Sequence, residues 1–93
     1  MNVEWKPRPK GPGQAFHAFS EDAAGERVEL LAYDFPANQL GPRMCAFEIY
    51  GRTYPAGSFH DQLARVETGS LEEAMHAATE MAAKSGNSWP KVL

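Results

Sequence analysis

One capped amphipathic segment, residues 69–86, constrains the fold of this 93-residue chain more than any other stretch. Ser70 occupies the expected N-cap position, and Glu73 follows three residues later, which is the spacing of a capping box. Gly86 is placed to adopt the left-handed conformation that ends many helices. Apolar side chains recur at three- and four-residue spacing along one stripe, at Leu71, Ala74, Met75, Ala78, Met81 and Ala82. Such a helix requires an apolar surface to cover, and the rest of the chain must supply it.

Four segments ahead of this helix have the composition of strands, at residues 14–19, 27–35, 44–50 and 59–67. The clearest is 44–50, where Cys45, Phe47 and Ile49 alternate with Ala46, Glu48 and Tyr50. Loops are expected at 20–26 and 37–42, and turns at 51–52 and 54–57. The sequence therefore predicts an α+β fold, an antiparallel sheet of three to four strands with one C-terminal amphipathic helix packed on one face.

Residues 20–35 admit a second interpretation. Ala24, Val28, Leu31 and Phe35 also fall at helical spacing, and Ser20 would cap such a helix. Gly25 would lie in its second turn and would cost about 1 kcal/mol. The hairpin is therefore favoured over the helix.

Residues 1–13 form a basic, Pro- and Gly-rich arm, and residues 14–93 form the single α+β domain. The prolines predict irregular or polyproline-like chain, with Trp5 held against the core. The arm carries three basic residues and one acidic residue, a charge of +2, whereas the remaining six basic and eleven acidic residues give −5. An acidic body disfavours phosphate backbones and suits basic partners. If nucleic acid binds at all, the residues expected to contact it are Trp5, Lys6, Arg8 and Lys10.

No pattern of catalytic or metal-binding residues stands out. Cys45 shares its phase with Phe47 and Ile49, which predicts a buried thiol rather than a nucleophile. Glu72, His76 and Glu80 share helical spacing that would suit a weak zinc or nickel site, but this spacing is equally that of a solvated helix face. We therefore expect no enzyme activity, no cofactor and no metal.

Protein binding is the function that the sequence favours. Tyr33, Tyr50 and Tyr54, with Arg43 and Arg52, cluster around the central strand and its turns, and Tyr and Arg are enriched at interface hot spots. The expected partner-binding residues are Tyr50, Arg52, Tyr54, Arg43, Glu48, Glu72 and Glu80, the carboxylates steering a basic surface rather than holding it. A single cysteine and no apolar run longer than four residues predict a cytoplasmic protein without a membrane span.

The run Gly-Ser-Leu-Glu-Glu-Ala at residues 69–74, preceded by short strands, is similar to the pattern of small phage and mobile-element proteins of the anti-CRISPR type. The resemblance covers residues 44–86. It implies a stoichiometric inhibitor of a host nucleic-acid-processing complex, acting in the host cytoplasm by occluding a nucleic-acid or subunit surface.

Overall fold

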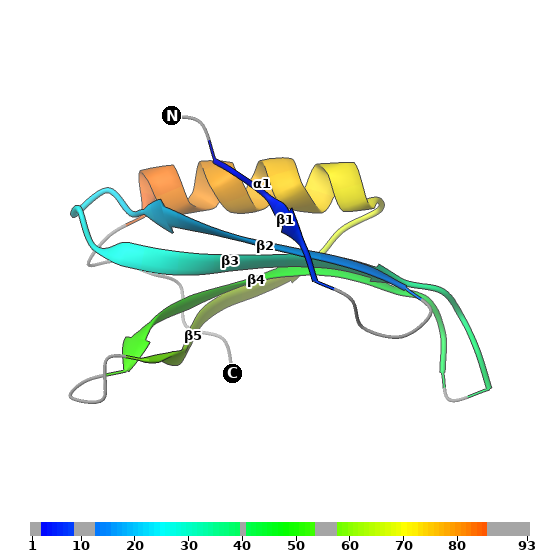
Figure 1. Ribbon diagram of the computed structural model, residues 1–93. Helices are drawn as coiled ribbons and strands as arrows, with labels where there is room; N and C mark the ends of the chain where they lie inside the picture. The colour runs from blue at the N-terminus through cyan, green and yellow to red at the C-terminus, as the bar shows by residue number, and fades with distance from the viewer. Residues whose placement is uncertain (1–2, 9–12, 40, 54–57, 86–93) are drawn as a thin grey trace.

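A computed structural model of the chain describes residues 3–8, 13–39, 41–53 and 58–85, with backbone only at 52–53 and 58–60. Five strands and one helix follow in order, namely β1 (Lys6–Pro7), β2 (Gln14–Glu21), β3 (Arg27–Phe35), β4 (Met44–Thr53), β5 (Ser58–Glu67) and α1 (Leu71–Lys84). The strands form one antiparallel sheet in sequence order, and α1 lies across one face of it (Figure 1). The predicted α+β class is confirmed, but the sheet has five strands rather than three or four.

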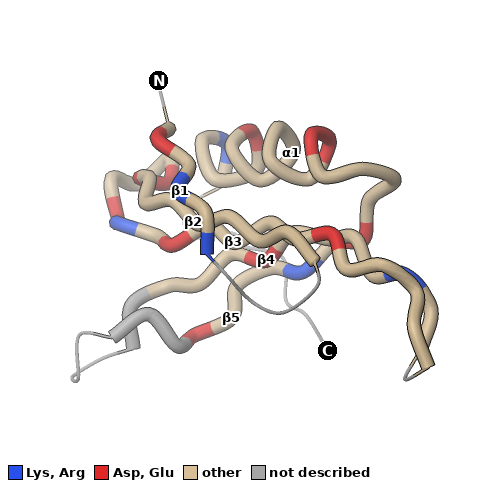
Figure 2. The backbone as a smooth tube through the Cα atoms, turned by 45° about the vertical axis from the view of Figure 1, so that its right-hand side comes forward, with Lys and Arg blue, Asp and Glu red and all other residues tan. Residues whose placement is uncertain are grey.

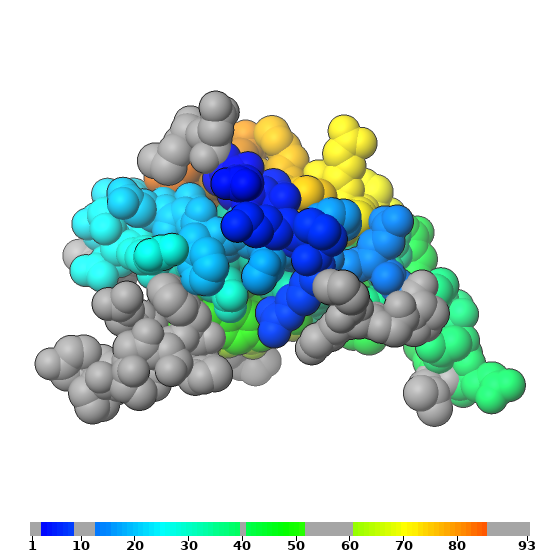
Figure 3. All heavy atoms as spheres, in the orientation of Figure 1, coloured from blue at the N-terminus to red at the C-terminus, as the bar shows by residue number. Residues whose placement is uncertain are grey.

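The additional strand comes from the basic arm. Lys6 and Pro7 pair with β2, and the backbone N–H of Arg8 donates to the carbonyl of Ala15 at 2.7 Å. The prediction of irregular chain is wrong here, because a proline is tolerated in a strand at the edge of a sheet. Trp5 packs against the main core as expected, and residues 3–8 lie along the side of the molecule (Figure 3).

The hairpin interpretation of residues 20–35 is confirmed, and the helical alternative is wrong. The turn between β2 and β3 is closed by Asp22, whose Oδ1 accepts from the backbone N–H groups of Ala24 and Glu26 at 2.9 and 3.0 Å. Gly25 has φ = 83°, a conformation that glycine adopts without strain. Local turn chemistry therefore outweighs the helical spacing of the apolar residues.

The predicted turn at Gly51 and Arg52 is wrong, because β4 continues through both residues to Thr53. The pairing with β5 is irregular between Ile49 and Tyr50 and again between Gly51 and Thr53. A Cβ atom at residue 51 would lie 3.0 Å from Cδ1 of Leu63. The glycine therefore serves close packing within a bulged pair of strands rather than a chain reversal.

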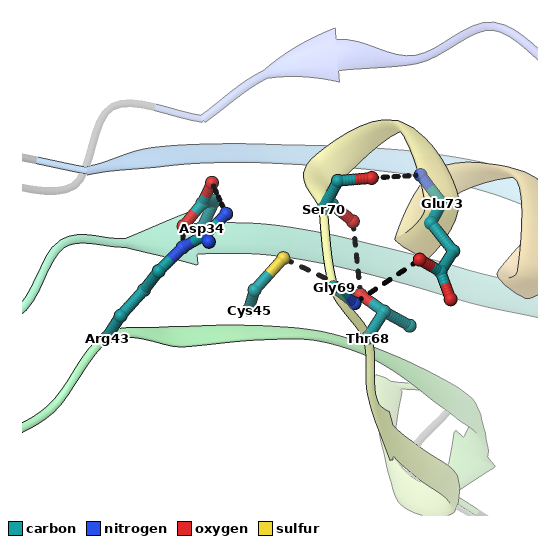
Figure 4. A network of polar contacts seen from close by, with 7 residues as sticks. All are labelled: Asp34, Arg43, Cys45, Thr68, Gly69, Ser70 and Glu73. Carbon is teal, nitrogen blue, oxygen red and sulfur yellow. Dashed lines mark hydrogen bonds and ion pairs between the residues drawn. The ribbon is translucent and has the colours of Figure 1, made fainter.

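The helix begins as the sequence predicts. The backbone N–H of Glu73 donates to Oγ of Ser70 at 3.1 Å, while the carboxylate of Glu73 accepts from the N–H of Gly69 at 3.3 Å (Figure 4). The carboxylate of Glu73 therefore bonds to the residue before the N-cap rather than to the N-cap itself, which is a variant of the expected capping box. At the other end Ser85 is the C-cap in extended conformation, and the predicted Gly86 lies outside the described residues.

The main core lies between α1 and the sheet, and a second, smaller cluster of buried residues, Ala15, Tyr33 and Ala46, lies on the other face of the sheet. Ala74, Ala78 and Ala82 are completely buried, and Leu71, Met75 and Met81 flank them, so the predicted stripe is confirmed. The largest fully buried side chains under the helix are Val28, Leu30, Phe47 and Ile49. The small alanines let the helix approach β3 and β4 closely, which allows dense packing.

Candidate functional site

The second face of the sheet is the candidate functional site. No helix of the described chain covers it, and the end of β4 and the beginning of β5 bend away from α1 on this side (Figure 1). The strand register places one row of side chains across all five strands of this open face, namely Lys6, His17, Leu31, Glu48 and Arg65. Alternation puts Tyr33 and Tyr50 on the same face, in the rows on either side of Glu48.

The half-buried carboxylate of Glu48 is the centre of a polar network. It accepts a hydrogen bond of 2.7 Å from the hydroxyl of Tyr33 and a second bond from the hydroxyl of Tyr50. The amide of Gln62 donates to the same carboxylate at 2.8 Å and contacts the Tyr50 hydroxyl at 3.2 Å. Three strands thus place their polar groups around one acid, and each tyrosine ring is held in a defined orientation.

This environment raises the pKa of both tyrosines. Burial, followed by the hydrogen bond to Glu48, raises the pKa of Tyr33 to about 12, while the positive charge of Arg65 opposes the shift. Burial and the bond to Glu48 raise the pKa of Tyr50 as well. Both hydroxyls therefore remain donors to Glu48 through the physiological pH range.

A shallow pocket of about 260 Å³ adjoins this network. Its lining combines apolar side chains with one charge of each sign, from Arg8, Ala15, Leu31, Tyr33, Phe35, Met44 and Glu48. The rings of Tyr33 and Phe35 stack with their centroids 5.1 Å apart, and Met44 is 41% exposed. An apolar floor beside oriented hydroxyls is typical of a contact surface for a protein side chain.

The structure does not bring all the predicted partner-binding residues together. Tyr50 and Glu48 share the open face, but Glu72 and Glu80 are exposed on α1, on the other side of the sheet. Glu80 lies 3.4 Å from Nε2 of His76 on the same helix. Arg52 is described only as a backbone position in β4, and Tyr54 lies outside the described residues. The predicted site therefore combines residues that lie on two different surfaces of the protein.

Arg43 is committed to an ion pair within the protein. Its Nε and a terminal nitrogen contact the two carboxylate oxygens of Asp34 at 2.9 and 2.8 Å, a bidentate pair at the end of β3 and the beginning of β4 (Figure 4). The guanidinium holds the pKa of Asp34 below its ordinary value. Arg43 is exposed and Asp34 is partly exposed, so the pair fixes the local geometry more than it stabilises the fold.

The residues expected to contact nucleic acid are also divided between two sides. Trp5 is half-buried and packs against the core on the helix side of the sheet, whereas Lys6 and Arg8 are exposed and lie at the β1 edge of the open face. Lys10 lies outside the described residues. Trp5 is therefore held in packing contacts and does not share a surface with the cations that were expected to act with it.

The side chains considered for catalysis or metal binding are Cys45 and the helix residues Glu72, His76 and Glu80. Cys45 is buried, as its phase predicted, and its Sγ lies 3.5 Å from the hydroxyl of Thr68 (Figure 4). Within the described ranges no three His, Cys, Asp or Glu side chains are grouped to hold a metal ion. In the same part of the chain no helix is long and apolar enough to cross a membrane.

Sequence reasoning missed Gln62, Arg65 and Leu31, which complete the open face. The alternation in 59–67 placed Arg65 and Glu67 on one face of their strand, but it carried no information on which strand they would meet. Comparisons with known proteins found no match to this chain among family models, characterised proteins or solved structures.

Proposed function

We propose that this protein is a non-catalytic protein-binding module that contacts its partner through the open face of the sheet. The observation that carries the proposal is the half-buried ring of Tyr50, whose hydroxyl is fixed by the carboxylate of Glu48 on a face that no described helix covers, while the buried Tyr33 holds that carboxylate from the other side. Aromatic side chains that are already fixed lose little conformational entropy on binding, and tyrosine is enriched at hot spots. Glu48 then acts by positioning the tyrosines rather than by steering the partner.

The partner we propose is a basic surface of a larger nucleic-acid-processing complex, blocked by one copy of this protein. Support comes from the formal net charge of −3 and from the acidic residues spread over both helix and sheet (Figure 2). The negative electrostatic field of such a protein raises its rate of association with a basic channel. Glu72 and Glu80 contribute to that field from the helix side and do not contact the partner. This is the activity that the resemblance to anti-CRISPR-type proteins implies.

Affinity capture from lysate of the host cells, with quantitative mass spectrometry, tests the proposal when three variants are compared. Tyr50→Ala should lower the affinity for the captured complex about thirtyfold, equivalent to about 2 kcal/mol. Tyr50→Phe keeps the ring and should lower it less. Glu80→Ala, on the opposite side of the molecule, is the matched control and should retain the complex.

The captured complex is then purified and its nucleic-acid binding is titrated with this protein. The proposal expects binding to disappear at an equimolar ratio. A complex that survives Tyr50→Ala but is lost in Glu80→Ala would move the contact to the helix, and a complex that still binds nucleic acid at saturation would contradict inhibition.

A further inference from the structure

Strand β5 forms one edge of the sheet. It pairs with β4 on one side, and no strand of the described chain pairs with its other side. The outward backbone groups at the end of this strand, up to Glu67, are available to another chain.

The direction of the edge groups follows from one hydrogen bond. The backbone N–H of Thr68 donates to the carbonyl of Cys45 at 2.9 Å, so residue 68 directs its backbone groups toward β4. In an antiparallel pair these groups alternate along the strand, so Val66 also faces β4, while Arg65 and Glu67 direct their N–H and C=O groups outward. The irregularities in the β4–β5 pairing lie at the other end, beyond Ile49, and leave this segment regular.

We propose that a second copy of this chain pairs with β5 in antiparallel orientation, about a two-fold axis that passes through Val66. In this register Arg65 lies opposite Glu67 of the second copy, and the same pair occurs again on the other side of the axis. Their outward N–H and C=O groups form a hydrogen-bonded pair in each case, and their opposite charges lie side by side. The contact is therefore self-complementary, as a two-fold interface requires.

Val66 supports the same register. Its side chain is 37% exposed and is one of three large hydrophobic residues with that degree of exposure in the described chain, the others being Phe19 and Met44. Across the proposed axis, Val66 meets Val66 of the second copy in a pair without hydrogen bonds, where side chains approach most closely. Its exposed surface is thereby covered.

The order of positive and negative residues at the end of β5 favours pairing between two copies rather than protection of the edge against association. Charges on an edge strand prevent association when copies bring like charges together. Here the residues on either side of Val66 carry opposite charges, so antiparallel pairing about Val66 brings attraction at both positions. The axis is perpendicular to the sheet, which keeps both helices on one side and joins the two open faces into one continuous surface on the other.

Sedimentation equilibrium of the full chain measures the association over a roughly hundredfold range of concentration, because dimerisation follows mass action. The mass should rise from 10.2 kDa toward twice that value. Glu67→Pro removes one outward N–H and one charge while leaving the bonds to β4, so it should be monomeric throughout with an unchanged circular dichroism spectrum.

A cysteine cross-link tests the register independently of that variant. Val66→Cys should form a disulfide-linked dimer under mild oxidation, because facing residues at the axis have a suitable Cα separation. Glu67→Cys is the matched control and should not, because each residue 67 faces residue 65 of the other copy. A chain that stays at 10.2 kDa at every concentration overturns the proposal, as does a dimer that cross-links through residue 67 but not residue 66.

Discussion

The hydroxyl of Tyr33 on β3 donates a 2.7 Å hydrogen bond to the carboxylate of Glu48 on β4, fifteen residues further along the chain. The two residues are not direct cross-strand partners, since Leu31 lies opposite Glu48 and Ala46 lies opposite Tyr33. The bond therefore crosses the open face diagonally, and it joins the buried phenol to the carboxylate that also holds Tyr50.

The contribution of Glu48 to the tyrosine pKa values is measurable by alkaline titration of tyrosinate absorbance. Glu48→Gln removes the negative charge that opposes ionisation, so the pKa of Tyr33 should fall from about 12. It should remain above the ordinary value near 10, because burial is the larger cause and persists in the variant. Glu67→Gln, on the next strand, is the control. An unchanged titration curve in Glu48→Gln would contradict the network.

Tyr33 also makes stability depend on pH in the alkaline range. The unfolded phenol ionises near pH 10 and the folded one near pH 12, so the unfolded state releases its proton first as pH rises. The contribution of Tyr33 to stability is complete below about pH 10 and is lost between about pH 10 and 12. Urea unfolding measured from about pH 8 to about pH 11, which reaches the middle of this window, should show a shallower loss of stability in Tyr33→Phe than in the parent.

The buried stripe of α1 is tested by placing a charge in it. Ala78→Asp buries an unpaired carboxylate at a completely buried position and should lower the free energy of unfolding by at least about 3 kcal/mol. Ala83→Asp, five residues further along the helix and exposed, should cost less than about 1 kcal/mol. Chemical denaturation of both variants provides the comparison, and equal losses would mean that the helix is wrongly oriented on the sheet.

Nucleic-acid binding through the arm should be weak and sensitive to salt. Gel-shift titrations with single- and double-stranded DNA and RNA should give dissociation constants above about 1 µM, with a log–log salt slope no steeper than about −3 for the three arm cations. Replacing Lys6, Arg8 and Lys10 together by Gln should remove the binding, whereas Lys84→Gln should not. Deleting the arm is avoided because β1 belongs to the sheet. Tight, salt-resistant and sequence-dependent binding would replace protein binding as the proposed function.

Elements with local signals could be predicted from the amino-acid sequence. The helix follows from Ser70, Glu73 and the spacing of its alanines, because capping and amphipathic packing depend on residues within a few turns. The strand at 27–35 was favoured by β-favouring residues after a glycine-containing turn, but a helix over 20–35 remained an alternative until the pairing of β3 with β2 and β4 excluded it.

Which separate segments meet depends on the packing and strand pairing of the whole fold. In the tertiary structure the proline-containing arm forms strand β1, and β4 continues through Gly51, because pairing with a neighbouring strand outweighs local turn and breaker signals. The same pairing places Glu48 in contact with Tyr33, Tyr50 and Gln62. Glu72 and Glu80 lie on α1, on the other side of the sheet. Strand register is a relation between segments distant in sequence, and alternation within one strand fixes which residues share a face but not which residues they meet across it.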